Sequence, residues 1–74
     1  MRIVFFGRLG DGPPAEPVPP GVRDTDALRA WLGEGRPELL DASIRIAVND
    51  EMILCNRALD EGDEIAFLPP MSGG

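Results

Sequence analysis

Histidine and lysine are absent from this 74-residue chain, and there is a single cysteine, Cys55. Without lysine there is no Schiff-base chemistry, and without histidine the usual general base is missing. One cysteine excludes an internal disulfide, and with no histidine beside it a Cys/His zinc site cannot form. We therefore expect no bound metal, and an autonomous enzyme would have to work with carboxylates alone.

The acidic residues include three adjacent pairs, Asp50-Glu51, Asp60-Glu61 and Asp63-Glu64. Neighbours on a strand point to opposite faces, and carboxylates in turns are solvated. The pairs are therefore interpreted as exposed charge rather than as a catalytic dyad.

Long apolar runs are also missing, since no stretch approaches the ~20 residues of a membrane span. The apolar start, residues 1–7, is too short for the core of a signal peptide. The formal net charge of −6 opposes binding to nucleic acid. We expect a cytoplasmic protein with no membrane or nucleic-acid partner, and a basic protein surface fits the charge better.

A chain of this length forms one domain with a modest core. Residues 2–7 are apolar on both faces, which predicts a central strand. Residues 9–21 hold five of the eight prolines and three glycines, a composition that we take to exclude a helix. Within them we predict a short edge strand at residues 15–19, antiparallel to the first strand, because the prolines at 17 and 19 block pairing on one side only.

One helix is predicted after Asp24, whose side chain is suited to an N-cap. Apolar residues then recur at helical spacing: Ala27, Leu28, Trp31 and Leu32. Trp31 is interpreted as core rather than as a ligand platform. Gly33 and Gly35 are candidate C-caps, and residues 37–40 are expected to form a single turn over the end of the core.

Three further strands follow. Residues 44–48 alternate apolar and polar, and Asn49-Asp50 predicts a tight hairpin into residues 51–54. A turn at 60–63, with Gly62 at a position of positive φ, leads to a last strand at 64–68. This order predicts the α+β class: a β-grasp, ubiquitin-like roll with a mixed sheet of four to five strands on one main helix, the first and last strands parallel and central.

Side-chain alternation divides the sheet residues between two faces. If Ile3 and Phe5 face the helix, Phe6 points out of the opposite face, and on the last strand Leu68 does the same. Together with Met52 they form a predicted apolar patch beside the C-terminal tail, which marks a surface for a protein partner.

The tail is Pro69-Pro70-Met71-Ser72-Gly73-Gly74, predicted as a segment distinct from the domain of residues 1–68. The prolines make a stiff, extended exit, and the glycines are narrow enough to thread a slot that rejects any side chain. Residues 71–74 reach about 13 Å when extended. The predicted chemistry is activation of the unhindered Gly74 carboxylate by ATP to an acyl-adenylate, followed by sulfur to give a thiocarboxylate.

Several segments resemble the small, sulfur-carrying subunit of molybdopterin synthase, the MoaD-type carriers. They are residues 4–9 (VFFGRL), 27–32, 47–49 (AVN) and above all 59–74, LDEGDEIAFLPPMSGG. The resemblance runs nearly end to end. It departs from the family in two places. The segment of residues 10–20 is shorter and richer in proline than the short helix usual there, and Met71 replaces a branched aliphatic residue.

The resemblance implies a carrier without an active site of its own, the active site lying on the large synthase subunit. A separate E1-like activating enzyme uses ATP to adenylate Gly74, and a sulfur donor acts indirectly. The thiocarboxylate then supplies sulfur for the molybdopterin dithiolene. No cofactor bound by this chain is implied, and Phe6, Met52 and Leu68 match the positions that dock the partners.

Other readings remain open at this point. The chain is alternatively a ubiquitin-like carrier for thiamine thiazole or tRNA thiolation, a protein-conjugating modifier, or a non-catalytic β-grasp interaction module. Cys55 invites a persulfide hypothesis, but no lysine or histidine lies beside it to activate the thiol, so we interpret it as packing or surface filler.

Overall fold

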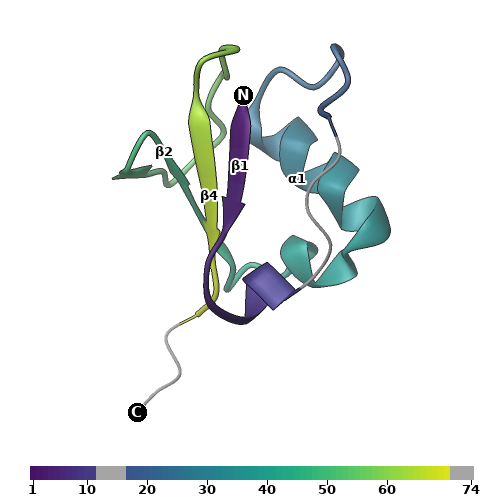
Figure 1. Ribbon diagram of the computed structural model, residues 1–74, viewed down its shortest axis with the longest axis vertical. Helices are drawn as coiled ribbons and strands as arrows, with labels where there is room; N and C mark the ends of the chain where they lie inside the picture. Colours follow the sequence, from purple (N-terminus) through teal and green to yellow (C-terminus); the bar gives the residue numbers. More distant parts are fainter. Residues whose placement is uncertain (12–16, 71–74) are drawn as a thin grey trace.

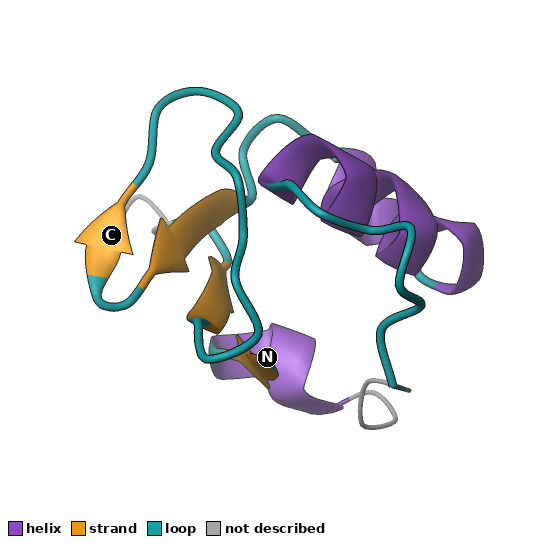
Figure 2. Cartoon of the chain, turned by 90° about the horizontal axis from the view of Figure 1, so that it is seen from above, coloured by secondary structure: helices purple, strands orange, loops and turns teal. Residues whose placement is uncertain are grey.

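The computed structural model describes residues 1–11 and 17–70. One layer is a four-stranded sheet, and the other is formed by the main helix, α1, which lies across one face of the sheet (Figures 1 and 2). The elements in chain order are β1 (Arg2–Phe5), the 3₁₀ helix η1 (Gly7–Asp11), α1 (Thr25–Gly35), the 3₁₀ helix η2 (Pro37–Leu40), β2 (Arg45–Val48), β3 (Glu51–Met52) and β4 (Glu64–Leu68).

The sheet has the strand order β1-β4-β2-β3. The first and last strands pair in parallel, as predicted, while β2 runs antiparallel to both β4 and β3. Within the described residues β1 stands at the end of this order rather than at the centre. The expectation of a central first strand is therefore wrong for the part of the chain that the structure describes.

The predicted edge strand at 15–19 is not formed where it is described, since residues 17–19 have no strand and residues 15 and 16 lie outside the described ranges. Instead the chain turns at once after β1 into η1, with Gly7 at φ +56° and Leu9 N–H donating to Phe6 O at 3.1 Å. The expectation that residues from Leu9 onward form no helix is wrong at this end. The prolines begin only at position 13, so a short i→i+3 turn still has its donors, and it buries Leu9.

The start of α1 is fixed by two side chains. Asp24 is the N-cap, as predicted, and its carboxylate accepts from Ala27 N–H at 2.8 Å. Asn56 Oδ1 accepts from Asp26 N–H at 2.8 Å. Thr25 is buried and its backbone N–H donates to Arg57 O at 2.9 Å. The segment that precedes β4 is thus hydrogen-bonded to the beginning of the helix.

Neither glycine at the end of α1 acts as a left-handed C-cap, so this expectation is wrong. The helix continues through Gly33 to Gly35, and Arg36 is the C-cap, its N–H donating to Leu32 O at 3.0 Å. Gly33 is buried because η2 packs directly on it. A Cβ at this position would lie 2.5 Å from Leu40 Cδ2. The predicted turn at 37–40 is confirmed as η2, and its Leu39 is fully buried.

The hairpin between β2 and β3 is confirmed, with Asn49 at φ 52° and Asp50 at φ 68°. Positive φ at both central residues is the type I′ pattern, which matches the twist of the strands. The turn at 60–63 closes through Asp63 N–H to Asp60 O at 3.1 Å. Gly62 does not have the predicted positive φ, since among the described glycines only Gly7 has one. A type I turn needs none.

The core lies between α1 and the inner face of the sheet. Ile65 and Phe67 of β4 are fully buried there, and Ile3 and Phe5 pack against them from β1. The Phe5 and Phe67 rings lie 5.6 Å apart between centroids. Trp31 is partly buried against the same cluster, as predicted. The predicted division of the sheet residues between two faces is confirmed for these positions.

Candidate docking face and tail root

The face of the sheet away from α1 carries a row of small and apolar side chains. Register places Val4 beside Ala66, Ala66 beside Ala47, and Ala47 beside Met52, so one row crosses all four strands. Leu68 and Arg45 pair in the next position of β4 and β2 toward the tail. We call these six residues, together with Phe6 just beyond β1, the outer face.

The three predicted docking residues differ in exposure. Phe6 is 47% exposed and Met52 48% exposed, while Leu68 is half-buried. Met52 is two strands from Leu68, about 10 Å across the sheet. The three therefore share a surface without forming one contact cluster, and Ala47 and Ala66 fill the space between them. Whether they bind a partner stays a prediction.

Sequence reasoning missed the alanines and Arg45 as members of this face. The signal was present, because residues 45–48 alternate between the two faces and the odd-numbered positions had to point away from the helix. What the sequence alone does not give is the register, which sets Arg45 beside Leu68.

The tail leaves the body at Pro69 and Pro70, directly after β4. Pro69 is half-buried and Pro70 is exposed. Gly7 makes room at this point, since a Cβ there would lie 3.0 Å from Pro69 Cγ. The other predicted tail residues, Met71, Ser72, Gly73 and Gly74, lie outside the described residues, so their roles and the boundary after residue 68 stay predictions.

Arg36 supports the structure beneath the tail root. Its guanidinium carbon lies 4.4 Å from the centroid of the Phe5 ring, and Nη2 donates to Leu9 O at 2.6 Å. A guanidinium over an aromatic face is attracted by the ring quadrupole. One residue therefore joins the end of α1, β1 and η1 at the end of the sheet from which the tail leaves.

Two carboxylates show pKa values that the fold lowers. The pKa of Asp41 is lowered first by the Ser43 backbone N–H and then by the Ser43 hydroxyl, both of which donate to it. The pKa of Asp63 is lowered first by the Asp60 backbone N–H and then by the Asn49 amide. Asp41 is exposed and Asp63 is half-buried, and both act as turn acceptors, consistent with structural roles.

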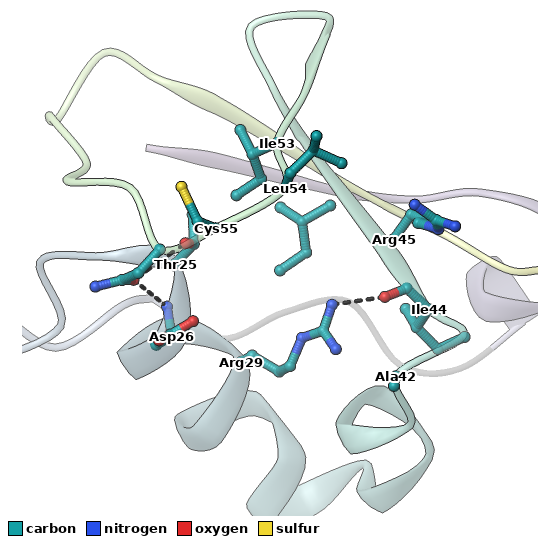
Figure 3. A pocket seen from close by; sticks show the side chains of 11 residues that line it. Thr25, Asp26, Arg29, Ala42, Ile44, Arg45, Ile53, Leu54 and Cys55 are labelled. Atoms are coloured by element: carbon teal, nitrogen blue, oxygen red, sulfur yellow. Dashed lines mark hydrogen bonds between the residues drawn. The ribbon is translucent and has the colours of Figure 1, made fainter.

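A groove of about 260 Å³ lies between α1 and the strand β2, and the segment after β3 forms its other wall (Figure 3). Several of its polar groups form hydrogen bonds within the fold. Arg29 Nη2 donates to Ile44 O at 2.6 Å, and Thr25 Oγ1 donates to Asn56 Oδ1 at 3.2 Å. Cys55 is exposed at the rim. In residues 1–11 and 17–70 no three His, Cys, Asp or Glu residues are grouped to hold a metal ion.

The described part of the chain also contains no helix long and apolar enough to cross a membrane. One helix on a mixed sheet, terminal strands in parallel and an exit at the end of the last strand define a ubiquitin-like β-grasp protein. Sequence comparison agrees with this class. The chain belongs to the ThiS family, whose family model matches residues 3–74.

The chain is also similar to a curated protein from Escherichia coli (strain K12), the "Molybdopterin synthase sulfur carrier subunit". The two are 29% identical over 80 aligned positions, which cover 100% of this chain and 99% of the relative. The match confirms the resemblance that the sequence motifs indicated, and it extends from end to end.

Proposed function

We propose that this chain is the sulfur carrier subunit of molybdopterin synthase. The observation that carries the proposal is the full-length match to a relative of that name. The fold supports it, because β4 leads straight into an exposed Pro70 beside a partly apolar face. A partner that contacts the outer face thereby receives the tail at a defined place.

The proposed chemistry takes place at Gly74. A carboxylate oxygen attacks the α-phosphorus of ATP on an activating enzyme, and pyrophosphate leaves. Hydrosulfide supplied by the donor then attacks the acyl carbon, and AMP leaves to give the thiocarboxylate. On the large subunit the thiocarboxylate sulfur attacks a carbon of the pterin precursor and displaces an oxygen substituent. Water then attacks the acyl carbon and the acyl–sulfur bond breaks, so the sulfur stays on the pterin and the Gly74 carboxylate is restored. The chain itself binds no cofactor in this scheme.

The body contributes position rather than catalysis. Two prolines restrict the direction in which the tail leaves β4. When the tail binds a partner, its backbone loses conformational entropy. This loss costs about 1–2 kcal/mol for each residue that must be fixed. A short tail on a rigid base limits that cost to a few residues.

The test is intact-mass spectrometry of the protein after incubation with the activating enzyme, ATP and a sulfur source. Replacement of one terminal oxygen by sulfur is expected, and deletion of Gly74 abolishes it. The Cys55→Ser variant is the matched control, because it removes the only thiol and leaves the tail intact. Loss of thiocarboxylate in Cys55→Ser would point to a persulfide on the chain instead.

Complementation separates the alternative carriers. Expression should restore molybdenum-cofactor synthesis in a strain lacking the small synthase subunit, and should not restore thiamine thiazole synthesis or tRNA thiolation in strains lacking those carriers. A covalent adduct on a target lysine, seen as a gel shift, would favour a protein modifier. Full complementation by the Gly74 deletion would favour a plain interaction module.

A further inference from the structure

Arg45 is a charged residue in an otherwise small and apolar part of the outer face. Its register partner on β4 is Leu68, and Ala47 lies two residues along the same strand. Leu54 comes shortly after β3, which borders β2 on the side away from β4. It is 88% exposed. Arg45 is itself exposed, and Figure 3 shows its side chain across the β2 ribbon from Arg29.

No acid in the described part of the chain, residues 1–11 and 17–70, forms a salt bridge with this guanidinium. Among the described residues the salt bridges are Arg2–Glu64 and Arg36–Glu38, and neither includes Arg45. Glu64 is the carboxylate on β4 that shares the outer face, and it pairs with Arg2 at 3.7 Å. Leu68 lies four positions further along β4, about 13 Å from it.

A partner that covers Leu68 and Ala47 must also cover Arg45. Burying a guanidinium without an acceptor costs several kcal/mol, whereas an arginine that meets a carboxylate at an interface forms strong, paired hydrogen bonds. The overall charge of −6 gives no general attraction to an acidic surface. A single local acid on the partner satisfies Arg45 and fixes the register of docking at the same time.

We propose that Arg45 is a specificity residue of the docking face, and that the large synthase subunit presents a carboxylate to it beside the apolar surface that receives Leu68. This inference rests on the proposed function, because the large subunit is the occupant. The ion pair would stand next to the tail root, so that correct pairing aligns the tail with the partner's active site.

The experiment measures the affinity of the full chain for the large subunit of the same organism by titration calorimetry. Arg45→Met keeps most of the apolar stem and removes the charge. It is expected to weaken binding about 30-fold or more, because the partner's acid is left buried and unpaired. Arg45→Glu is expected to weaken it further through repulsion.

Three controls make the result specific. Arg23→Glu makes the same charge change before α1, at an exposed site away from the outer face, and is expected to leave the affinity unchanged. Met52→Asp tests whether the face is used, and should weaken binding. Raising the ionic strength should weaken binding of the native protein more than that of Arg45→Met. Urea unfolding shows that each variant is folded.

The outcomes separate the two claims. If the native protein binds and Arg45→Met binds equally well or more tightly, the inference is wrong while the proposed function stands. If Arg23→Glu weakens binding as much as Arg45→Glu, the affinity depends on the net charge of the protein and not on the position of Arg45. The inference is then again wrong. If the native protein does not bind the large subunit, both fail.

Discussion

Packing of η2 on Gly33 makes a quantitative prediction about stability. Alanine is preferred to glycine in a helix by about 1 kcal/mol, so Gly33→Ala should stabilise an isolated α1. In the protein the new Cβ would lie 2.5 Å from Leu40 Cδ2, 2.6 Å from Cγ and 3.1 Å from Cδ1. Overpacking of this kind costs about 1–3 kcal/mol. We therefore expect Gly33→Ala to destabilise the protein by about 1 kcal/mol.

Leu40 tests the cause, because all three of these atoms are absent from alanine. Leu40 is 55% exposed, so Leu40→Ala alone should cost little. In that background Gly33→Ala should become stabilising by about 1 kcal/mol, as its helix propensity dictates. The double-mutant cycle should give a coupling of about 2 kcal/mol.

Urea unfolding followed by the fluorescence of Trp31, on the same helix, measures the cycle. With a slope of about 1 kcal/mol per molar urea, the expected changes move the midpoint by about 1 M in opposite directions. A coupling near zero, with Gly33→Ala stabilising both backgrounds, would mean that Leu40 swings aside freely and would refute the steric argument.

Three further changes test other parts of the structure. Asn56→Ala should lower the free energy of unfolding by about 1–2 kcal/mol, because its Oδ1 accepts from Asp26 N–H at the start of α1; urea titration checks this. Asp50→Gly should raise the urea midpoint by removing the cost of φ 68° at a non-glycine residue. Asp63→Asn should destabilise the protein above about pH 4 and lose this effect as the pH falls, since the pKa of Asp63 is lowered by the Asp60 N–H and the Asn49 amide. The pH dependence of Asp63→Asn is measured as the difference in urea midpoint from the native protein between pH 6 and about 2.

Local sequence patterns are sufficient to predict the elements whose caps and turns are formed by neighbouring residues. Asp24 and the apolar spacing after it predict α1, and Asn49-Asp50 predicts the hairpin. The division of β4 between two faces follows from alternation alone. These features depend on residues within one turn or one strand of each other, so the sequence contains all the information that they need.

Several of the wrong expectations concern residues whose packing neighbours lie on another element. Gly33 was expected to end the helix, but Leu40 needs the space and the helix continues. Positive φ was assigned to Gly62, whereas Gly7 takes it next to Pro69, from the far end of the chain. The neighbours of Arg45 likewise required the register of β2 with β4. A single sequence shows that a glycine or an arginine is present, but not what packs beside it.

The parallel pairing of β1 and β4 has a mechanical consequence. A partner that pulls on the tail loads β4 at its C-terminal end, while β1 is held at its start by Arg2 N–H to Asp63 O and at its end by Phe6 N–H to Phe67 O, at 2.9 and 3.0 Å. In this geometry a force on the C-terminal end acts along the two strands. It loads all the hydrogen bonds between β1 and β4 together instead of breaking them one after another. Under the proposed function, the domain should therefore withstand repeated loading of its C-terminal end by a partner.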